Sequence, residues 1–253
     1  MEELSRSPAA SAPRRRTPWT HLALLSLLAW PATSNAGLIT SNGGASESGL
    51  GSYIGSIGVS NNTATTATIT VALTNISPAP NGGFITAFAF NNPGTVGGGD
   101  ILNVANFSAT DPDGGGSGVA FALLGGPSFS DSINASPYGS FDIGASLPGG
   151  SFQGGGSPAQ GIGVGESATF TFDVTGTDLL NLSQASLEAA LASGSGGIDS
   201  FFIVRFRGFA DGGSDKVPAA SPVPEPSTLA LGGIGLGIGG LGYVRRRRQR
   251  VAS

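Results

Sequence analysis

The chain has few of the side chains that perform covalent catalysis. It has no cysteine, His21 is its only histidine, and Lys216 is its only lysine. His21 lies in an amino-terminal leader, so the remaining chain lacks Ser-His-Asp and Cys-His machinery and histidine-based metal sites. Lys216 adjoins a Pro-rich stretch, a poor place for the dry pocket that a Ser-Lys pair needs. The ten aspartates leave a carboxylate pair for glycoside cleavage open without singling out two of them, and we expect a protein that is not an enzyme.

Two glycine-rich turns, at residues 111–116 and 211–215, carry oxygen ligands of the kind that calcium prefers. Carboxylates on such turns suit this hard cation, although neither turn has the spacing of an EF-hand. The candidate ligands are Asp111, Asp113, Asp211 and Asp215. The alternative interpretation is that Asp and Gly simply form turns here, and then no cofactor is needed.

Charge is distributed unevenly along the chain. Residues 37–222 contain thirteen acidic residues and only Arg205, Arg207 and Lys216 as basic ones, which gives this segment a net charge of −10. A partner with a phosphate backbone, such as a nucleic acid, is therefore excluded from the expected functions. Arg205 and Arg207 are expected to pair with nearby carboxylates rather than to bind a ligand.

The strands that must position these residues follow from the hydrophobic pattern. Apolar and polar residues alternate over residues 67–74, 168–174 and 201–209, which predicts half-buried antiparallel strands. In the last of these the arginines occupy the polar, outward face. Nearly continuous apolar runs over residues 84–90 and 119–124 predict strands that are buried on both faces.

One helix is predicted, over residues 178–192 with Asp178 as its N-cap. The Gly-, Ser- and Pro-rich segment over residues 144–165 predicts a long mobile loop. Glycine accounts for 43 of 253 residues, which favours turns and short strands over helices. The fold class we predict is mainly β: an antiparallel β-sandwich or jelly-roll-like domain with one short helix.

A secretory signal peptide is predicted at the amino terminus. A triple arginine at residues 14–16 precedes an apolar stretch over residues 19–30, and the small residues Ser34 and Ala36 follow. This is the order that signal peptidase requires. The apolar stretch is too short to cross a hydrocarbon core of about 30 Å as a helix. We predict cleavage between Ala36 and Gly37.

Three elements follow one another near the carboxyl terminus. Pro224-Glu225-Pro226 comes first, then an uncharged stretch over residues 228–244, and then a basic cluster of Arg245, Arg246, Arg247, Arg248 and Arg250. As a helix the stretch would be about 25 Å long, just enough to cross a bilayer, and we expect the arginines to remain on the cytoplasmic side. Its seven glycines make it a marginal anchor, which suits transient attachment. The two prolines are expected to hold Glu225 extended and exposed.

These three elements resemble the PEP-CTERM sorting domain of Gram-negative bacteria. The resemblance covers about thirty residues of the chain and implies processing by an exosortase, a membrane-embedded cysteine transpeptidase-like enzyme, commonly alongside exopolysaccharide production. It implies nothing about the fold of the preceding region. The alternative interpretation of the tripeptide is an ordinary juxtamembrane linker.

The sequence thus divides into five predicted segments. They are a signal peptide (1–36), a β-rich extracellular domain (37–216), a Pro-rich linker (217–227), a transmembrane helix (228–244) and a basic cytoplasmic tail (245–253).

We expect an exported protein that passes through the inner membrane as a precursor and ends at the cell surface or in the extracellular matrix, with a structural or adhesive role. Its expected partners are signal peptidase, an exosortase and exopolysaccharide. The alternative function is a calcium-stabilised carbohydrate-binding module, although no tryptophan follows residue 30 to form a sugar-stacking platform.

Overall fold

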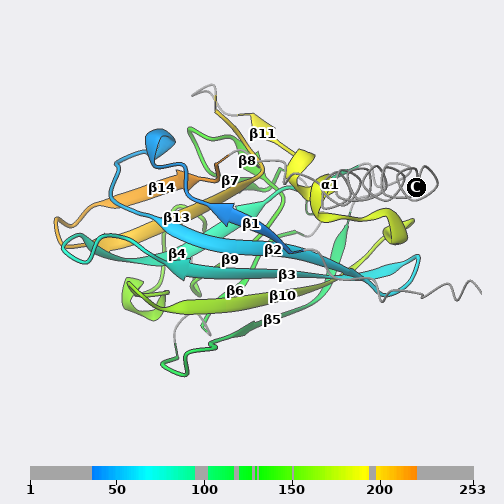
Figure 1. Ribbon diagram of the computed structural model, residues 1–253, viewed down its shortest axis with the longest axis horizontal. Coiled ribbons are helices and arrows are strands. Elements are labelled where there is room, and N and C mark those ends of the chain that lie inside the picture. The colour runs from blue at the N-terminus through cyan, green and yellow to red at the C-terminus, as the bar shows by residue number, and fades with distance from the viewer. Residues whose placement is uncertain are drawn as a thin grey trace, which may run out of the picture. The chain divides into compact units, whose positions relative to one another are not determined.

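The computed structural model describes residues 36–94, 102–116, 120–126, 129, 131–149, 151–193 and 198–220. They fall in one unit built around two five-stranded antiparallel sheets (Figure 1). The first sheet contains, in spatial order, β1 (Ala36–Thr40), β2 (Tyr53–Asn61), β3 (Thr66–Asn75), β10 (Ser167–Thr175) and β5 (Asn103–Thr110). The second contains β14 (Ser214–Pro218), β13 (Phe202–Phe209), β4 (Gly82–Phe90), β9 (Ile143–Ser146) and β6 (Ala122–Gly125). The expected mainly β, antiparallel architecture is confirmed.

Aromatic rings from both sheets fill the space between them. The ring of Phe88 on β4 lies 4.6 Å from that of Phe170 on β10 and 5.7 Å from that of Phe202 on β13, measured between centroids. Phe172 approaches Phe88 edge-on at 6.2 Å. All four side chains are fully buried. Because alternate residues of each strand face this layer, the sheets pack face to face in a β-sandwich-like arrangement.

Four of the five predicted strands are confirmed, as β3, β4, β10 and β13. The fifth prediction, at residues 119–124, was only partly right. The strand β6 begins at Ala122 and lies at the edge of its sheet, and Leu123 and Leu124 are only partly buried. An apolar run indicates a strand but does not distinguish an edge position from a central one.

The prediction of a long loop over residues 144–165 was only partly right. This segment supplies most of β9, a 3₁₀ turn η2 (Pro158–Gln160) and Ile162, which bridges to Ile85 of β4. Gly144 lies in β9 where a Cβ atom would stand 2.2 Å from the carbonyl oxygen of Phe88. At this position glycine marks the close approach of two strands rather than a loop.

Both faces of β13 are buried, whereas its alternation predicted an exposed polar face. Ile203 is fully buried and Arg205 is only 8% exposed. A short hairpin, β7 (Ile133–Asn134) and β8 (Ser140–Phe141), covers this face, and its Tyr138 and Phe141 pack in one cluster with Ile203. The cover comes from a distant part of the chain, so the strand's own pattern could not predict it.

The helix is shorter than predicted and begins later. A 3₁₀ turn, η3 (Leu179–Asn181), precedes the α-helix α1 (Gln184–Ala189), and Asp178 adopts a left-handed φ of 55° without capping either. Ser183 is the actual N-cap. Its Oγ accepts from the Ser186 N–H at 3.2 Å, and its own N–H donates to Ser186 Oγ at 3.0 Å. Because this reciprocal capping box fixes the N-terminus of the helix at Ser183, the helix begins later than predicted.

The first and last segments of the described chain lie side by side and are joined by backbone hydrogen bonds. Asn42 N–H donates to the Pro218 carbonyl at 2.9 Å, and Ala220 N–H donates to the Thr40 carbonyl at 2.8 Å. The remaining short elements are η1 (Gly43–Ala45) and the pair β11 (Ala192–Ser193) and β12 (Asp199–Ser200). Apart from Ala36, the predicted signal peptide, the Pro-Glu-Pro motif, the membrane helix and the arginine cluster lie outside the described residues. Within the described ranges, no helix is long and apolar enough to span a membrane.

Candidate functional site

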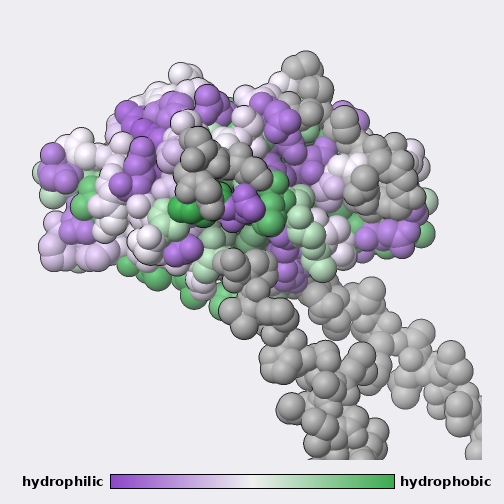
Figure 2. Space-filling model, turned by 90° about the horizontal axis from the view of Figure 1, so that it is seen from above, coloured by the Kyte–Doolittle hydropathy of each residue, from purple (hydrophilic) through white to green (hydrophobic). Residues whose placement is uncertain are grey.

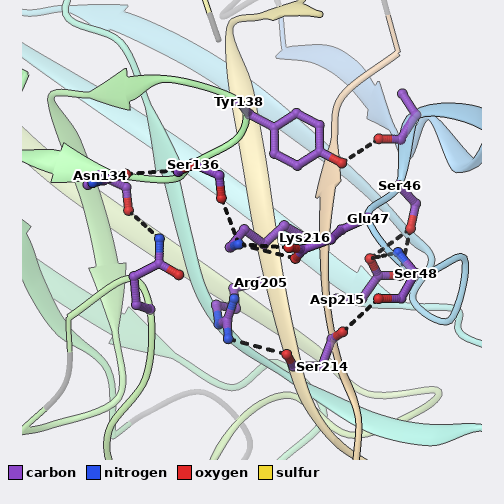
Figure 3. A network of polar contacts seen from close by, with 12 residues as sticks. Ser46, Glu47, Ser48, Asn134, Ser136, Tyr138, Arg205, Ser214, Asp215 and Lys216 are labelled. Atoms are coloured by element: carbon purple, nitrogen blue, oxygen red, sulfur yellow. Dashed lines mark hydrogen bonds and ion pairs between the residues drawn. The ribbon is translucent and has the colours of Figure 1, made fainter. Parts of the chain in front are cut away.

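A group of polar side chains lies on the outer face of the second sheet, at its β13–β14 edge (Figure 3). We call Glu47, Tyr138, Arg205 and Lys216 the charged cluster. Arg205 and Lys216 stand directly opposite each other in the strand register, and both are more than nine-tenths buried. Like charges at directly opposed positions repel, so the fold must supply a compensating charge. It comes from Glu47, which lies between β1 and β2.

Lys216 has a complete set of partners. Its Nζ donates to the two carboxylate oxygens of Glu47 at 3.1 and 3.2 Å and to the Ser136 carbonyl at 2.7 Å. An ammonium group has three hydrogens, so these contacts account for all of them. The Glu47 side chain is 38% exposed, so water screens the ion pair. Lys216, which the sequence placed beside the Pro-rich stretch, is thus a buried residue of β14 that ties two loops to the sheet.

Among the described residues, neither arginine forms the expected ion pair with a carboxylate. Within the described residues the only ion pair is that of Lys216 and Glu47. Arg205 Nη2 donates to Ser214 Oγ at 3.3 Å, and its buried Nε has no hydrogen-bond partner. Arg207 Nη1 donates to the Gly155 carbonyl at 2.7 Å. Burial lowers the pKa of Arg205, while the negative charge of Glu47 opposes that shift.

Tyr138 completes the charged cluster from the covering hairpin. Its hydroxyl donates to the Ala45 carbonyl at 2.5 Å. Burial, followed by the negative charges of Glu47 and Asp215, raises the pKa of Tyr138 to about 12. The neutral phenol is the form that the folded state stabilises.

The stability of the fold is therefore expected to decline in strong alkali. The pKa of Tyr138 is raised above the unfolded value of about 10, so its contribution is complete below about pH 10 and is lost as the pH rises toward 12. Ultraviolet titration of tyrosinate in the purified full chain, compared with a Tyr138→Phe variant, checks this. The difference between the two curves should show one phenol that ionises near pH 12, and an ionisation near pH 10 would contradict it.

Asp215, next to Lys216 on β14, organises a loop on the opposite face of the strand. Its fully buried carboxylate accepts from Ser46 Oγ through both oxygens, at 2.8 and 2.6 Å. It also accepts from the backbone N–H groups of Ser48, Leu50 and Gly51 at 2.8–2.9 Å. Convergent backbone N–H groups of this kind form a nest for a negative charge. Asp215 thus fixes the chain between β1 and β2, which also carries Glu47.

The other three predicted calcium ligands lie in turns. Asp111 Oδ1 accepts from the N–H groups of Asp113 and Gly114, and Asp211 Oδ1 accepts from the N–H of Gly213. These are the local bonds by which aspartate stabilises a turn. Asp113 Oδ2 accepts from the Ser167 N–H at 2.8 Å. No three acidic or histidine side chains of the described residues form a metal-binding group, and calcium binding stays a prediction.

A cleft of about 770 Å³ is lined in part by Gly139 and Ser140 of the covering hairpin. Its walls are residues 91–94 after β4, residues 189–192 at the end of α1 and beyond it, and five further residues: Phe129, Asp131, Gly139, Ser140 and Asp142. Phe129 and Asp131 both have positive φ angles, 45° and 48°. Aspartate tolerates this left-handed region, whereas phenylalanine does so only under strain, and strained residues gather at functional sites.

Asp142 is the central acid of this cleft. Its carboxylate accepts from the backbone N–H groups of Asn92, at 2.7 Å, and of Asp131. Burial raises the pKa of Asp142, and these two hydrogen bonds act in the opposite direction. The Asn91 side-chain amide donates to the Ala190 carbonyl at 2.9 Å and joins the cleft wall to the end of α1. The arrangement offers amide, hydroxyl and carboxylate groups to a polar ligand.

The sequence did not single out Glu47, Tyr138 or Asp142. Each is one acidic or aromatic residue in a glycine- and serine-rich segment, and its role depends on partners far along the chain. Lys216 and Glu47 are separated by 169 positions. The only available signal was that Lys216 is the single lysine, next to an alternating apolar pattern.

No protein-family model matches this chain, and no curated protein and no solved structure matches it either.

Proposed function

We propose that the chain is an exported protein that an exosortase processes and that is delivered to the cell surface or the exopolysaccharide matrix, where its β domain has a structural or adhesive role. The order of three elements at the carboxyl terminus carries this proposal: Pro224-Glu225-Pro226, the uncharged stretch and the arginine cluster. Such an order inserts the stretch with the arginines in the cytoplasm and leaves Glu225 exposed on the other side.

The position of the described strands supports the proposal. They lie between Ala36, next to the predicted cleavage position, and Pro218, before the Pro-Glu-Pro motif. A domain between two sorting signals is what a surface-delivered cargo requires. Its stability comes from the aromatic layer between the sheets rather than from disulfides, since the chain has no cysteine. Seen from above, the described surface is largely hydrophilic or weakly polar, with hydrophobic patches between (Figure 2).

Cell fractionation tests the proposal. Cells that carry an exosortase should release the wild-type domain or display it at the surface, while a Glu225→Gln variant should remain as a precursor in the inner membrane. Equal delivery of the two chains would remove the basis of the sorting assignment.

The cleft around Asp142 favours a second candidate function, the binding of a carbohydrate. Its volume lies within the range of small-molecule sites, and its walls present the amides, hydroxyl and carboxylates that hydrogen-bond to sugar hydroxyls. Phe129 is only 7% exposed and contributes little stacking surface. A ligand held mainly by hydrogen bonds is therefore the better match.

If the cleft binds sugars, the full chain should give discrete signals on a glycan array. Replacement of the exposed Asp131 by alanine should then lower the affinity about tenfold, which corresponds to the loss of one hydrogen bond to a charged group. Asp178→Ala is the matched control, because Asp178 also has a left-handed φ, 55°, and lies outside the cleft. The array is run with and without millimolar calcium, which also tests the predicted calcium sites. An array without binding signals under both conditions would contradict carbohydrate binding, and the structural role would then be the remaining proposal.

A further inference from the structure

Gly37, the predicted first residue of the mature chain, is buried beneath α1. It is the second residue of β1, and a Cβ atom at this position would lie 1.5 Å from Gln184 Nε2 and 2.8 Å from Glu188 Oε1. A carbon–carbon bond is about 1.5 Å, so the Glu188 carboxylate lies within about 4.3 Å of the Gly37 Cα. The structure thus places the Glu188 carboxylate near Gly37, the residue whose nitrogen signal cleavage would expose, and by the same reasoning within about 5.8 Å of that nitrogen.

The β1–β2 register fixes where the Gly37 nitrogen points. Ser41 N–H donates to the Tyr53 carbonyl at 3.1 Å. Hydrogen-bonded pairs alternate with unbonded pairs along an antiparallel ladder, so Gly37 and Ile57, which face each other, form a bonded pair. The nitrogen of Gly37 is therefore directed at the carbonyl of Ile57, and this position is held by the whole strand.

We propose that the domain contains a binding site for its own processed amino terminus, in which the Gly37 ammonium pairs with Glu188. The inference rests on the proposed export. Hydrolysis of the Ala36–Gly37 bond by signal peptidase consumes one water, leaves a carboxylate on Ala36 and an amine on Gly37, and the amine takes up a proton at neutral pH because its pKa is about 7.7–8.0. Of the three N–H groups that result, one can keep the ladder bond to Ile57, and the other two are available to donate to Glu188.

The acceptor is already in position before cleavage. Gln184 Nε2 donates to Glu188 Oε1 at 2.5 Å across one turn of α1. The helix itself is held by the Ser183 cap and by the fully buried Leu187. Because the carboxylate is fixed by its neighbours, the new ammonium gains a partner with little further ordering. Processing would thus convert an amide next to a carboxylate into an ion pair that fastens β1 to α1.

A double-mutant cycle on the full chain tests this inference. One arm is the processed protein and the other carries Ala36→Phe, which removes the small residue that signal peptidase needs at an exposed position of β1. In the processed protein, Glu188→Gln should lower the melting temperature by about 2–4 °C, the shift expected for loss of one charge-assisted contact in a domain of this size. In the uncleaved protein, Glu188→Gln should alter the melting temperature by no more than about 1 °C. Asp199→Asn, at an exposed acid on β12, is the control for charge alone and should give no such difference.

The outcomes separate the inference from the proposed function. Amino-terminal sequencing comes first, and a chain that does not begin at Gly37 overturns both the cleavage prediction and the inference. A chain that begins at Gly37 but shows equal Glu188→Gln shifts in both arms overturns the inference and leaves export intact. If Ala36→Phe fails to fold, an alanine inserted between Ala36 and Gly37 replaces it. The insertion moves the ammonium by about 3.5 Å and should abolish the Glu188→Gln effect.

Discussion

Replacement of Asp215 by alanine is expected to lower the free energy of unfolding by about 3 kcal/mol. The change deletes a fully buried carboxylate and leaves the N–H groups of Leu50 and Gly51 without their acceptor. Water can reach the exposed Ser48 but not the buried Gly51, so part of the loss cannot be recovered. Because the same loop carries Glu47, the ion pair with Lys216 should weaken as well. Urea unfolding of the purified full chain measures the change.

Asp211→Ala is the matched control, in the same β13–β14 hairpin and four positions away. Asp211 is exposed, and the one donor to its carboxylate among the described residues is the N–H of Gly213 in its own turn. Its loss should cost about 0.5 kcal/mol or less, as is usual for surface positions. Equal effects of the two substitutions would show that Asp215 does not organise the loop.

This pair of aspartates also illustrates how far the sequence could predict the site. Asp211 and Asp215 look equivalent in a glycine-rich turn, yet one is exposed and the other fully buried. Burial depends on whether a distant segment, here residues 46–51, folds over the position. Such contacts leave no periodic pattern in the chain. Sequence reasoning therefore grouped Asp211 and Asp215 because their surroundings have a similar composition, although the two residues have different roles in the fold.

The strands were more predictable because their signal is local. In β3 and β10, buried residues such as Ile69 and Phe170 alternate with threonines that are more exposed. This alternation of buried and exposed residues is enough to identify such strands from the sequence. The pattern failed for β9, where Gly144 takes the place of a side chain that would clash with Phe88. It also failed for the outer face of β13, which a returning hairpin covers. In both cases a tertiary contact decided the outcome.

Exchange of Glu225 for glutamine is expected to leave most of the full-length precursor in the inner membrane. The substitution keeps the size and the two flanking prolines, so only the negative charge is lost. A plain membrane anchor would not respond, because residues 228–244 and the arginine cluster would still insert and orient. A sorting motif should respond, because the exposed carboxylate is the feature that an enzyme can recognise. Deletion of residues 245–250 controls for topology, since it should impair membrane retention under either interpretation.

The most direct measurement is fractionation of cells that carry the sorting enzyme, with an antibody against the β domain. Wild-type protein and the Glu225→Gln variant are compared in inner-membrane, surface and released fractions. We predict that the wild-type domain appears at the surface or in the medium as a shortened chain that begins at Gly37, and that the variant accumulates at full precursor length in the inner membrane. Equal release or surface delivery of the two proteins would mean that Glu225 is not recognised and would contradict the proposed sorting route.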